Sequence, residues 1–198
     1  PGNRVTFVID RNINYTNICT SGCRFCAFYR PPGADDGYVL DWEALAAKLV
    51  ELKDCGGSGV LLQGGLNPEL SLAYYLKLVS FIRGFGLAVH GFSPPEIFYM
   101  AENNALSLAE LIRRLMDAGL SSIPGGGAEI LVDRVRQQIS PQKCSASQWL
   151  EVMAAAHRAG LKTSATMMFG HLETRAERIE HLVKIRELQD ATGGFTSF

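Results

Sequence analysis

Three cysteines lie close together near the start of the chain, where Cys19, Cys23 and Cys26 form the pattern C-x3-C-x2-C. Thiolates at these spacings on one loop can converge on a single metal centre. Closed structural zinc needs four ligands, and no fourth cysteine or histidine lies within twenty residues of Cys26. A [4Fe–4S] cluster with three protein thiolates fits better, because one iron stays open to a non-protein ligand. We therefore predict such a cluster, with zinc and three free buried cysteines as the alternatives.

The other two cysteines, Cys55 and Cys144, stand alone near the expected ends of helices. An isolated cysteine in such a place is typically a small apolar residue that fills space. We expect both to be buried and neither to bind metal.

Glycines cluster after two short apolar runs of the sequence. Gly64 and Gly65 follow one run, and a triple glycine at 125–127 follows another. Without a Cβ atom, glycine lets the backbone approach a ligand closely or adopt positive φ. The alternative for the first pair is a simple turn. Glu129 comes just after the triple glycine, where we expect it to open a short helix or to contact a ligand.

Two of the four histidines lie at the expected carboxyl ends of strands, where barrel enzymes build their sites. His171 is the stronger candidate for a proton-transfer group and His90 the second. His157 and His181 lie in the middle of expected helices, which indicates structural roles.

Short apolar runs alternate with amphipathic stretches along the chain, as expected for buried parallel strands separated by helices. The predicted strands are 11–16, 59–63, 87–92, 121–124, 163–169 and 195–198. Helix starts are marked by Asp41 and by three capping boxes, Ser107 with Glu110, Ser145 with Gln148 and Thr174 with Glu177.

Strand–helix alternation predicts an α/β fold with a parallel sheet and right-handed crossovers. Periodicity alone leaves a doubly wound sheet and a (β/α) barrel open. A complete barrel takes about 250 residues, and this chain has 198. We expect one domain over residues 1–198, a partial barrel of about six βα units that lacks the C-terminal part of a longer chain.

Composition excludes several classes of protein. Apolar residues make up 47% and charged residues 20%, and the net charge is −1 without long blocks of one sign, so we expect no nucleic-acid partner. No apolar run approaches the roughly 18 residues of a membrane span, and the first residues lack a signal-peptide layout. We expect a cytoplasmic protein with no membrane partner.

The cysteine pattern, with Phe25 before the third cysteine, resembles the signature C-x3-C-x-aromatic-C of the radical S-adenosylmethionine (SAM) superfamily. The resemblance implies that Cys19, Cys23 and Cys26 hold the [4Fe–4S] cluster and that SAM binds its open iron. One electron then cleaves SAM to a 5′-deoxyadenosyl radical. Phe25 would pack against the adenine of SAM.

The same resemblance gives roles to residues after later strands. Gly64 and Gly65 would hold the SAM amino group, although Leu66 stands where relatives usually carry glutamate. Glu129 would bind the SAM ribose, and Glu173 belongs to a G-x-x-E element. Several relatives hold the SAM carboxylate with an arginine of the next helix, but residues 145–151 contain none.

The segments NINYTNIC, FSPPEI, PGGGAEILVDRVR, ISPQKC and TMMFGHLET more closely resemble the cyclic dehypoxanthine futalosine synthases of menaquinone biosynthesis. These enzymes abstract hydrogen from the ribose of dehypoxanthine futalosine and close a ring onto its benzoate. An external one-electron reductant such as flavodoxin or ferredoxin is implied. Glu129, Glu173 and His171 are the candidates for the proton acceptor. Aminofutalosine synthases and the radical SAM enzymes that form the deazaflavin chromophore are the alternatives, and an iron–sulfur electron carrier is the non-enzymatic one.

Overall fold

A computed structural model describes residue 3 and residues 7–198 of the chain. The strands are β1 (Asp10–Asn14), β2 (Gly59–Gln63), β3 (Ala88–Gly91), β4 (Leu120–Ile123), β5 (Lys162–Ser164) and β6 (Phe195–Ser197). The helices are α1 (Trp42–Asp54), α2 (Leu72–Gly84), α3 (Pro94–Asn103), α4 (Leu108–Ala118), α5 (Asp133–Ile139), α6 (Ala146–Arg158) and α7 (Arg175–Thr192). No helix in this described part is long and apolar enough to cross a membrane.

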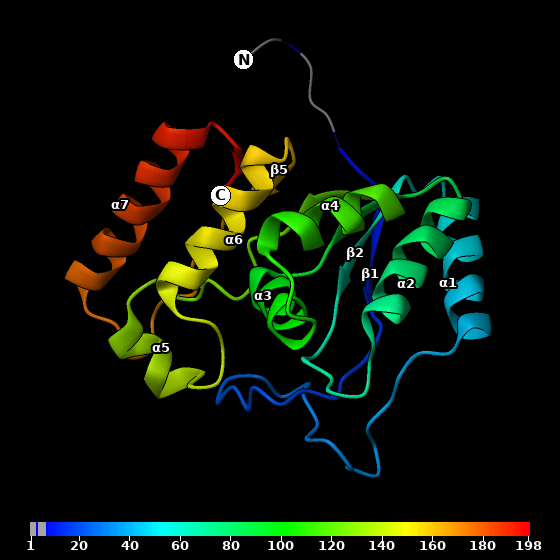
Figure 1. The fold of residues 1–198 in the computed structure, drawn as a ribbon, viewed down its shortest axis with the longest axis horizontal. Coiled ribbons are helices and arrows are strands. Elements are labelled where there is room, and N and C mark those ends of the chain that lie inside the picture. Colours follow the sequence, from blue (N-terminus) through cyan, green and yellow to red (C-terminus); the bar gives the residue numbers. More distant parts are fainter. Residues whose placement is uncertain (1–2, 4–6) are drawn as a thin grey trace.

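All strand pairs of the sheet are parallel, and the strand order is β1-β2-β3-β4-β5-β6. A doubly wound sheet reverses its order at a switch point, whereas a (β/α) barrel adds its strands in chain order. The sheet is therefore part of a (β/α) barrel, as predicted. The helices line one side of it, from α1 and α2 next to the first strands to α7 at the other end (Figure 1).

The two faces of the sheet differ in composition. Val60 and Leu62 of β2 and Val89 of β3 are buried among the helices and belong to the main core. Side chains alternate between the faces of a strand, so Gln63 and His90 point to the opposite, inner face of the partial barrel. Both are only partly buried there. The helices thus cover an apolar face, and a polar face lines the interior.

Most helix starts follow the predicted capping chemistry. Asp41 caps α1, and the boxes of Ser145 with Gln148 and Thr174 with Glu177 are both complete. The box predicted at Ser107 is only half formed, because the Glu110 carboxylate pairs with two arginines of α4 instead of returning to the cap.

Two details of the predicted elements are wrong. The expected strand 163–169 is only three residues long as β5, because its later residues form the loop toward α7. Glu129 does not open a helix, since α5 begins at Asp133 and Glu129 lies in an irregular segment with φ of 42°. A left-handed conformation at a non-glycine residue is unusual and indicates local strain.

Candidate functional site

A pocket forms where the cysteine loop meets the carboxyl ends of β1, β2 and β3. It brings together residues that the sequence placed far apart. All three clustered cysteines, Phe25, Gly64 and Gly65 line it, and so do Gln63, Glu96 and Lys143. Six of the nine predicted site residues thus share one cavity.

The cysteine loop is anchored to three separate parts of the chain by its backbone. The Cys19 N–H donates to the Arg30 carbonyl at 2.8 Å, the Thr20 N–H to a carbonyl just after β2, and the Arg24 N–H to the Ile139 carbonyl at the end of α5. The Arg30 guanidinium closes the loop by donating to the carbonyls of Ala27 and Tyr29. Hydrogen bonds to the rest of the chain and within the loop therefore fix its shape.

The arrangement of the three thiols suits a cluster. Cys19 and Cys23 are buried on either side of the Ser21 hydroxyl, and Cys26 is half-buried at the same pocket. Burial raises the pKa of the Cys23 thiol, and the nearby Lys143 ammonium opposes that rise. Across the described residues, no three His, Cys, Asp or Glu side chains gather closely enough for one metal ion. Three cysteine thiols at one pocket match the donor set of a [4Fe–4S] cluster that leaves one iron open to a non-protein ligand.

The two glycines after β2 are required by contacts within the protein. A Cβ atom on Gly64 would lie 2.5 Å from the Tyr15 ring, and one on Gly65 would lie 2.1 Å from the Ile18 carbonyl oxygen and 2.7 Å from the Cys19 Cβ. These contacts add an internal packing reason for the two glycines, while their role toward SAM stays a prediction. Gly65 also lets the cysteine loop pack against the end of β2.

Glu96, which sequence reasoning did not single out, is buried beneath the same glycines. Its carboxylate accepts hydrogen bonds from the Tyr15 hydroxyl at 2.7 Å, the Gly64 N–H at 3.0 Å and the backbone and side chain of Ser93 at 2.7 and 2.6 Å. Burial raises the pKa of Glu96, and these donors oppose the rise. The spacing of Ser93 and Glu96 is a capping box at the start of α3, which is the signal that identifies this glutamate.

The triple glycine after β4 packs tightly against neighbouring elements. Only Gly127 has a positive φ, 76°, and a Cβ atom there would meet the Pro95 ring at 2.3 Å. A Cβ atom on Gly125 would lie 2.6 Å from the Ala165 backbone. This segment is fixed by packing within the protein.

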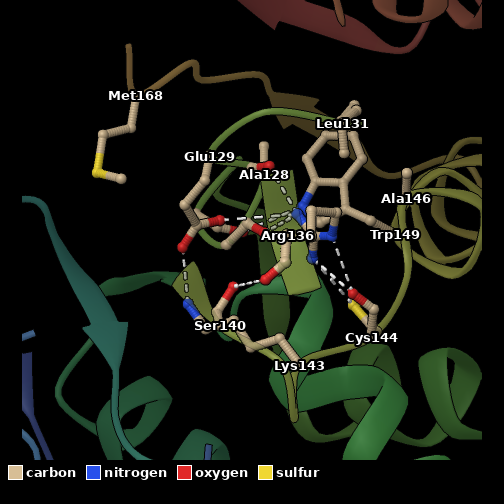
Figure 2. A network of polar contacts seen from close by, with 12 residues as sticks. Ala128, Glu129, Leu131, Arg136, Ser140, Lys143, Cys144, Ala146, Trp149 and Met168 are labelled. Atoms are coloured by element: carbon tan, nitrogen blue, oxygen red, sulfur yellow. Dashed lines mark hydrogen bonds and ion pairs between the residues drawn. The ribbon is translucent and has the colours of Figure 1, made fainter. Parts of the chain in front are cut away.

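The predicted ligand residue Glu129 is buried in a network of charges (Figure 2). Its carboxylate accepts from Lys143 Nζ at 2.7 Å and lies 3.8 Å from Arg136 Nη1, and its other oxygen has no hydrogen-bond partner. Arg136, also buried, donates to the carbonyls of Gly127, Ala128 and Cys144. Arg136 and Glu129 therefore hold the loop after β4 against the loop before α6.

Lys143 connects this network to the pocket. Its ammonium group lies 5.4 Å from the centre of the Phe25 ring. Burial lowers the pKa of Lys143, but the Glu129 carboxylate and the Cys23 thiol outweigh that effect and raise it. Lys143 is the one cationic side chain among the described residues that line the pocket. It lies just before the segment 145–151, in which the sequence offered no arginine.

His171 and Glu173 lie in the loop after β5, and neither lines the pocket. The Glu173 carboxylate accepts the N–H groups of Gly170 and His171 and pairs with Arg178. These donors lower its pKa to about 2. His171 Nε2 lies 2.9 Å from the Met168 carbonyl. The catalytic role of both residues stays a prediction, and the geometry gives Glu173 the contacts of a loop anchor.

The two isolated cysteines differ from each other. Cys144 is buried, as predicted, whereas Cys55 is exposed at the end of α1, so that prediction is wrong for Cys55. Neither lines the pocket of the three clustered cysteines.

Comparison with known proteins gives a family match over most of the chain. The radical SAM superfamily matches residues 13–185. A cyclic dehypoxanthine futalosine synthase of Halalkalibacterium halodurans is 47% identical over 195 residues, which are 98% of this chain and 53% of that protein. A 5-amino-6-(D-ribitylamino)uracil–L-tyrosine 4-hydroxyphenyl transferase of Methanosarcina mazei is 44% identical over 199 residues, covering all of this chain and 52% of that protein. The chain spans about half the length of these relatives.

Solved structures agree on the fold. Methylornithine synthase superposes with a TM-score of 0.70 over 91% of this chain and 51% of its own, at 17% identity. A maturase of the [FeFe]-hydrogenase superposes with a TM-score of 0.73 over 94% of this chain and 40% of its own, at 16% identity. Radical SAM enzymes use a [4Fe–4S] cluster and SAM. The chain belongs to the radical SAM superfamily.

Proposed function

We propose that Cys19, Cys23 and Cys26 hold the [4Fe–4S] cluster and that the pocket beside them binds SAM. The observation that carries this proposal is the convergence of these thiols with Phe25 and the glycine pair on one cavity. Cluster and SAM together supply one-electron cleavage chemistry that yields a 5′-deoxyadenosyl radical.

The residues around the pocket would position SAM. Phe25 is 43% exposed at the pocket, so its ring is available to pack against adenine. Lys143 offers a positive charge to a carboxylate, in place of the arginine that residues 145–151 lack. Glu129 is proposed to contact the ribose of SAM through its unpaired oxygen, which requires the Lys143 side chain to leave room for the ligand.

For the reaction, we propose conversion of dehypoxanthine futalosine to its cyclic product, with electrons from an external reductant such as flavodoxin or ferredoxin. Support comes from the motifs of the sequence and from the 47% identical synthase. Several archaeal relatives, 40–44% identical, are named as 4-hydroxyphenyl transferases instead. A 4-hydroxyphenyl transfer from L-tyrosine to 5-amino-6-(D-ribitylamino)uracil is therefore the second candidate reaction.

An isotope experiment with the reconstituted full-length enzyme separates these reactions. Substrate carrying deuterium at carbon 4 of the ribose should deliver one deuterium to released 5′-deoxyadenosine and yield a cyclised product. An enzyme that adds the adenosyl radical to its substrate would release little 5′-deoxyadenosine. Deuterium-free 5′-deoxyadenosine with unchanged substrate would overturn the proposal, and turnover of tyrosine with the ribitylaminouracil would establish the second candidate.

A further inference from the structure

The inner face of the partial barrel is polar to an unusual degree. Barrel interiors are normally filled by branched apolar side chains. Leu61 and Ala88 are the apolar side chains at the inward positions of β1, β2 and β3. The polar residues on this face include Asn12, Asn14, Gln63, His90, Ser122 and Ser164. Amides, hydroxyls and an imidazole suit a small molecule rich in hydroxyl groups better than a packed core.

His90 is the titratable ring on this face. Its Nδ1 lies 2.6 Å from the Ser122 hydroxyl on the next strand, and its Nε2 has no hydrogen-bond partner among the residues described. The Ser122 contact fixes the orientation of the ring, and in the tautomer whose Nδ1–H donates to the Ser122 hydroxyl, Nε2 is unprotonated and can act as a base. Burial lowers the pKa of His90, while Asp10 at the start of β1 raises it. The effect of burial outweighs that of Asp10, so the pKa of His90 is lowered and the neutral form of the ring is favoured.

The position of His90 relative to the pocket follows from strand register. His90 pairs with Leu61 of β2, and Gln63, which lines the pocket, lies two residues further along β2 on the same face. Two residues of a strand span about 7 Å. His90 thus lies one layer of side chains below the pocket, where a substrate placed beside the bound adenosyl group would reach into the barrel.

We propose that His90 Nε2 accepts the proton that the substrate loses when its ring regains aromaticity, with Ser122 as the residue that positions the imidazole. This inference rests on the proposed cyclisation. Closing the ring forms one carbon–carbon bond and leaves an unpaired electron. Restoring aromaticity breaks one carbon–hydrogen bond, so the proton goes to His90 and the electron returns to the oxidised iron–sulfur centre.

The contacts of the other candidates favour His90. The Glu173 carboxylate is already bound by backbone N–H groups and Arg178. Glu129 does not line the pocket, and the proposed function assigns its unpaired oxygen to the ribose of SAM. His171 lies on an exposed loop, where Nε2 is occupied by the Met168 carbonyl.

The test uses His90→Asn in the reconstituted full-length enzyme. Asparagine keeps a polar atom near the position of Nδ1, which preserves the Ser122 contact, and removes the basic Nε2. A lost proton acceptor costs about 10²-fold or more in rate. The expected result is that cyclised product per 5′-deoxyadenosine falls by about that factor while 5′-deoxyadenosine formation stays within about twofold, and that added imidazole restores part of the product.

His157→Gln is the matched control, because His157 lies on α6 and contacts Thr163 and Thr192 away from the inner face. It should leave the product ratio unchanged. An unchanged ratio in His90→Asn, or equal loss of both products without imidazole rescue in a folded variant, would overturn the assignment. A fall in the ratio for His171→Gln alone would place the proton acceptor there. If the wild-type enzyme forms no 5′-deoxyadenosine with this substrate, the proposed cyclisation itself fails.

Discussion

The Glu96 carboxylate accepts the backbone N–H of Gly64 at 3.0 Å, and so connects the start of α3 to the end of β2. The same carboxylate accepts from the Tyr15 hydroxyl, one residue beyond β1. One buried side chain thus fixes the ends of the first three strands relative to each other. The radical SAM pattern that the sequence resembles places a glutamate after the glycine pair, and here Leu66 stands at that position. Glu96, in the first turn of the helix that follows β3, instead places a carboxylate beside Gly64.

Glu96→Gln should weaken SAM binding and leave iron content unchanged. The amide that replaces one carboxylate oxygen cannot accept from all of the present donors, and an unpaired buried donor costs about 1–3 kcal/mol of stability. Calorimetric SAM titration and a melting curve measure the two effects. Glu102→Gln, on the exposed side of α3, is the control. Normal SAM affinity in Glu96→Gln would show that Glu96 is not needed to position Gly64 for SAM binding.

Replacing any one of Cys19, Cys23 and Cys26 by alanine should abolish the cluster. Anaerobic reconstitution of the wild-type protein should give about four irons per chain, with the absorption of a [4Fe–4S] centre. Cys55→Ala serves as the control because that thiol is exposed and remote from the pocket. Equal loss of iron in the Cys55 or Cys144 variant would show that the ligand assignment is wrong.

Gly65→Ala should lower iron content as well as SAM affinity. Its methyl group would overlap the Ile18 carbonyl and the Cys19 Cβ, so the cysteine loop must move. Gly84→Ala is a matched control, since a Cβ atom there meets nothing within 4 Å and alanine favours a helix. Iron analysis after reconstitution distinguishes the two variants. Full iron loading in Gly65→Ala would show that the loop tolerates the methyl group.

Lys143→Met should destabilise the folded protein, because it leaves the buried Glu129 carboxylate with only the more distant Arg136. Breaking a buried ion pair costs up to about 3–5 kcal/mol. The double variant with Glu129→Gln should recover part of the loss, since the side chain that lost its nearer cation is then a neutral amide. Urea unfolding of the two single variants and the double variant measures this coupling. Lys77→Met, which removes an exposed cation above the ring of the half-buried Trp42, is the control. Additive losses would contradict the coupling.

Stability should fall as the pH drops below about 6.5, in part because of His181. This ring is buried, its Nδ1 accepts the Leu131 N–H at 3.0 Å, and burial together with Arg136 and Lys184 lowers its pKa to about 4. The unfolded state then binds the proton more tightly than the folded state, so stability is present above the unfolded pKa and is lost as the pH falls toward 4. We expect a loss of roughly 1–3 kcal/mol between pH 7 and pH 4. His181→Asn should show a shallower pH dependence in urea unfolding, and an unchanged dependence would assign the loss to other groups.

Local chemistry in the sequence predicted much of this molecule. The cysteine spacing indicated the metal centre, strand–helix alternation indicated the parallel sheet, and Ser145 and Thr174 marked helix starts correctly. These features depend on residues near each other in the chain. Predicting a partial barrel also required the length of the chain, because 198 residues are fewer than the about 250 of a complete barrel.

What the sequence could not predict depends on contacts between distant segments. Nothing near Glu96 in the chain indicates that Tyr15 and Gly64 donate to it from 81 and 32 positions away. The pairing of Glu129 with Lys143 likewise arises only when the loops on either side of α5 fold back on each other. For Cys55 the sequence predicted burial, because isolated cysteines are usually buried, but the side chain is exposed. Residue type alone does not decide whether the end of a helix faces water.

The backbone anchors of the cysteine loop bear on how the metal centre assembles. The loop is tied to Arg30, to the end of β2 and to the end of α5 through backbone groups and not through its thiols, so these hydrogen bonds restrict its conformation independently of iron. Metal binding then does not have to fold the protein, in contrast to small domains that are unfolded without their metal. Removal of iron by a chelator should therefore leave a native-like apoprotein, and loading and stripping should be repeatable on the same molecules without a refolding step.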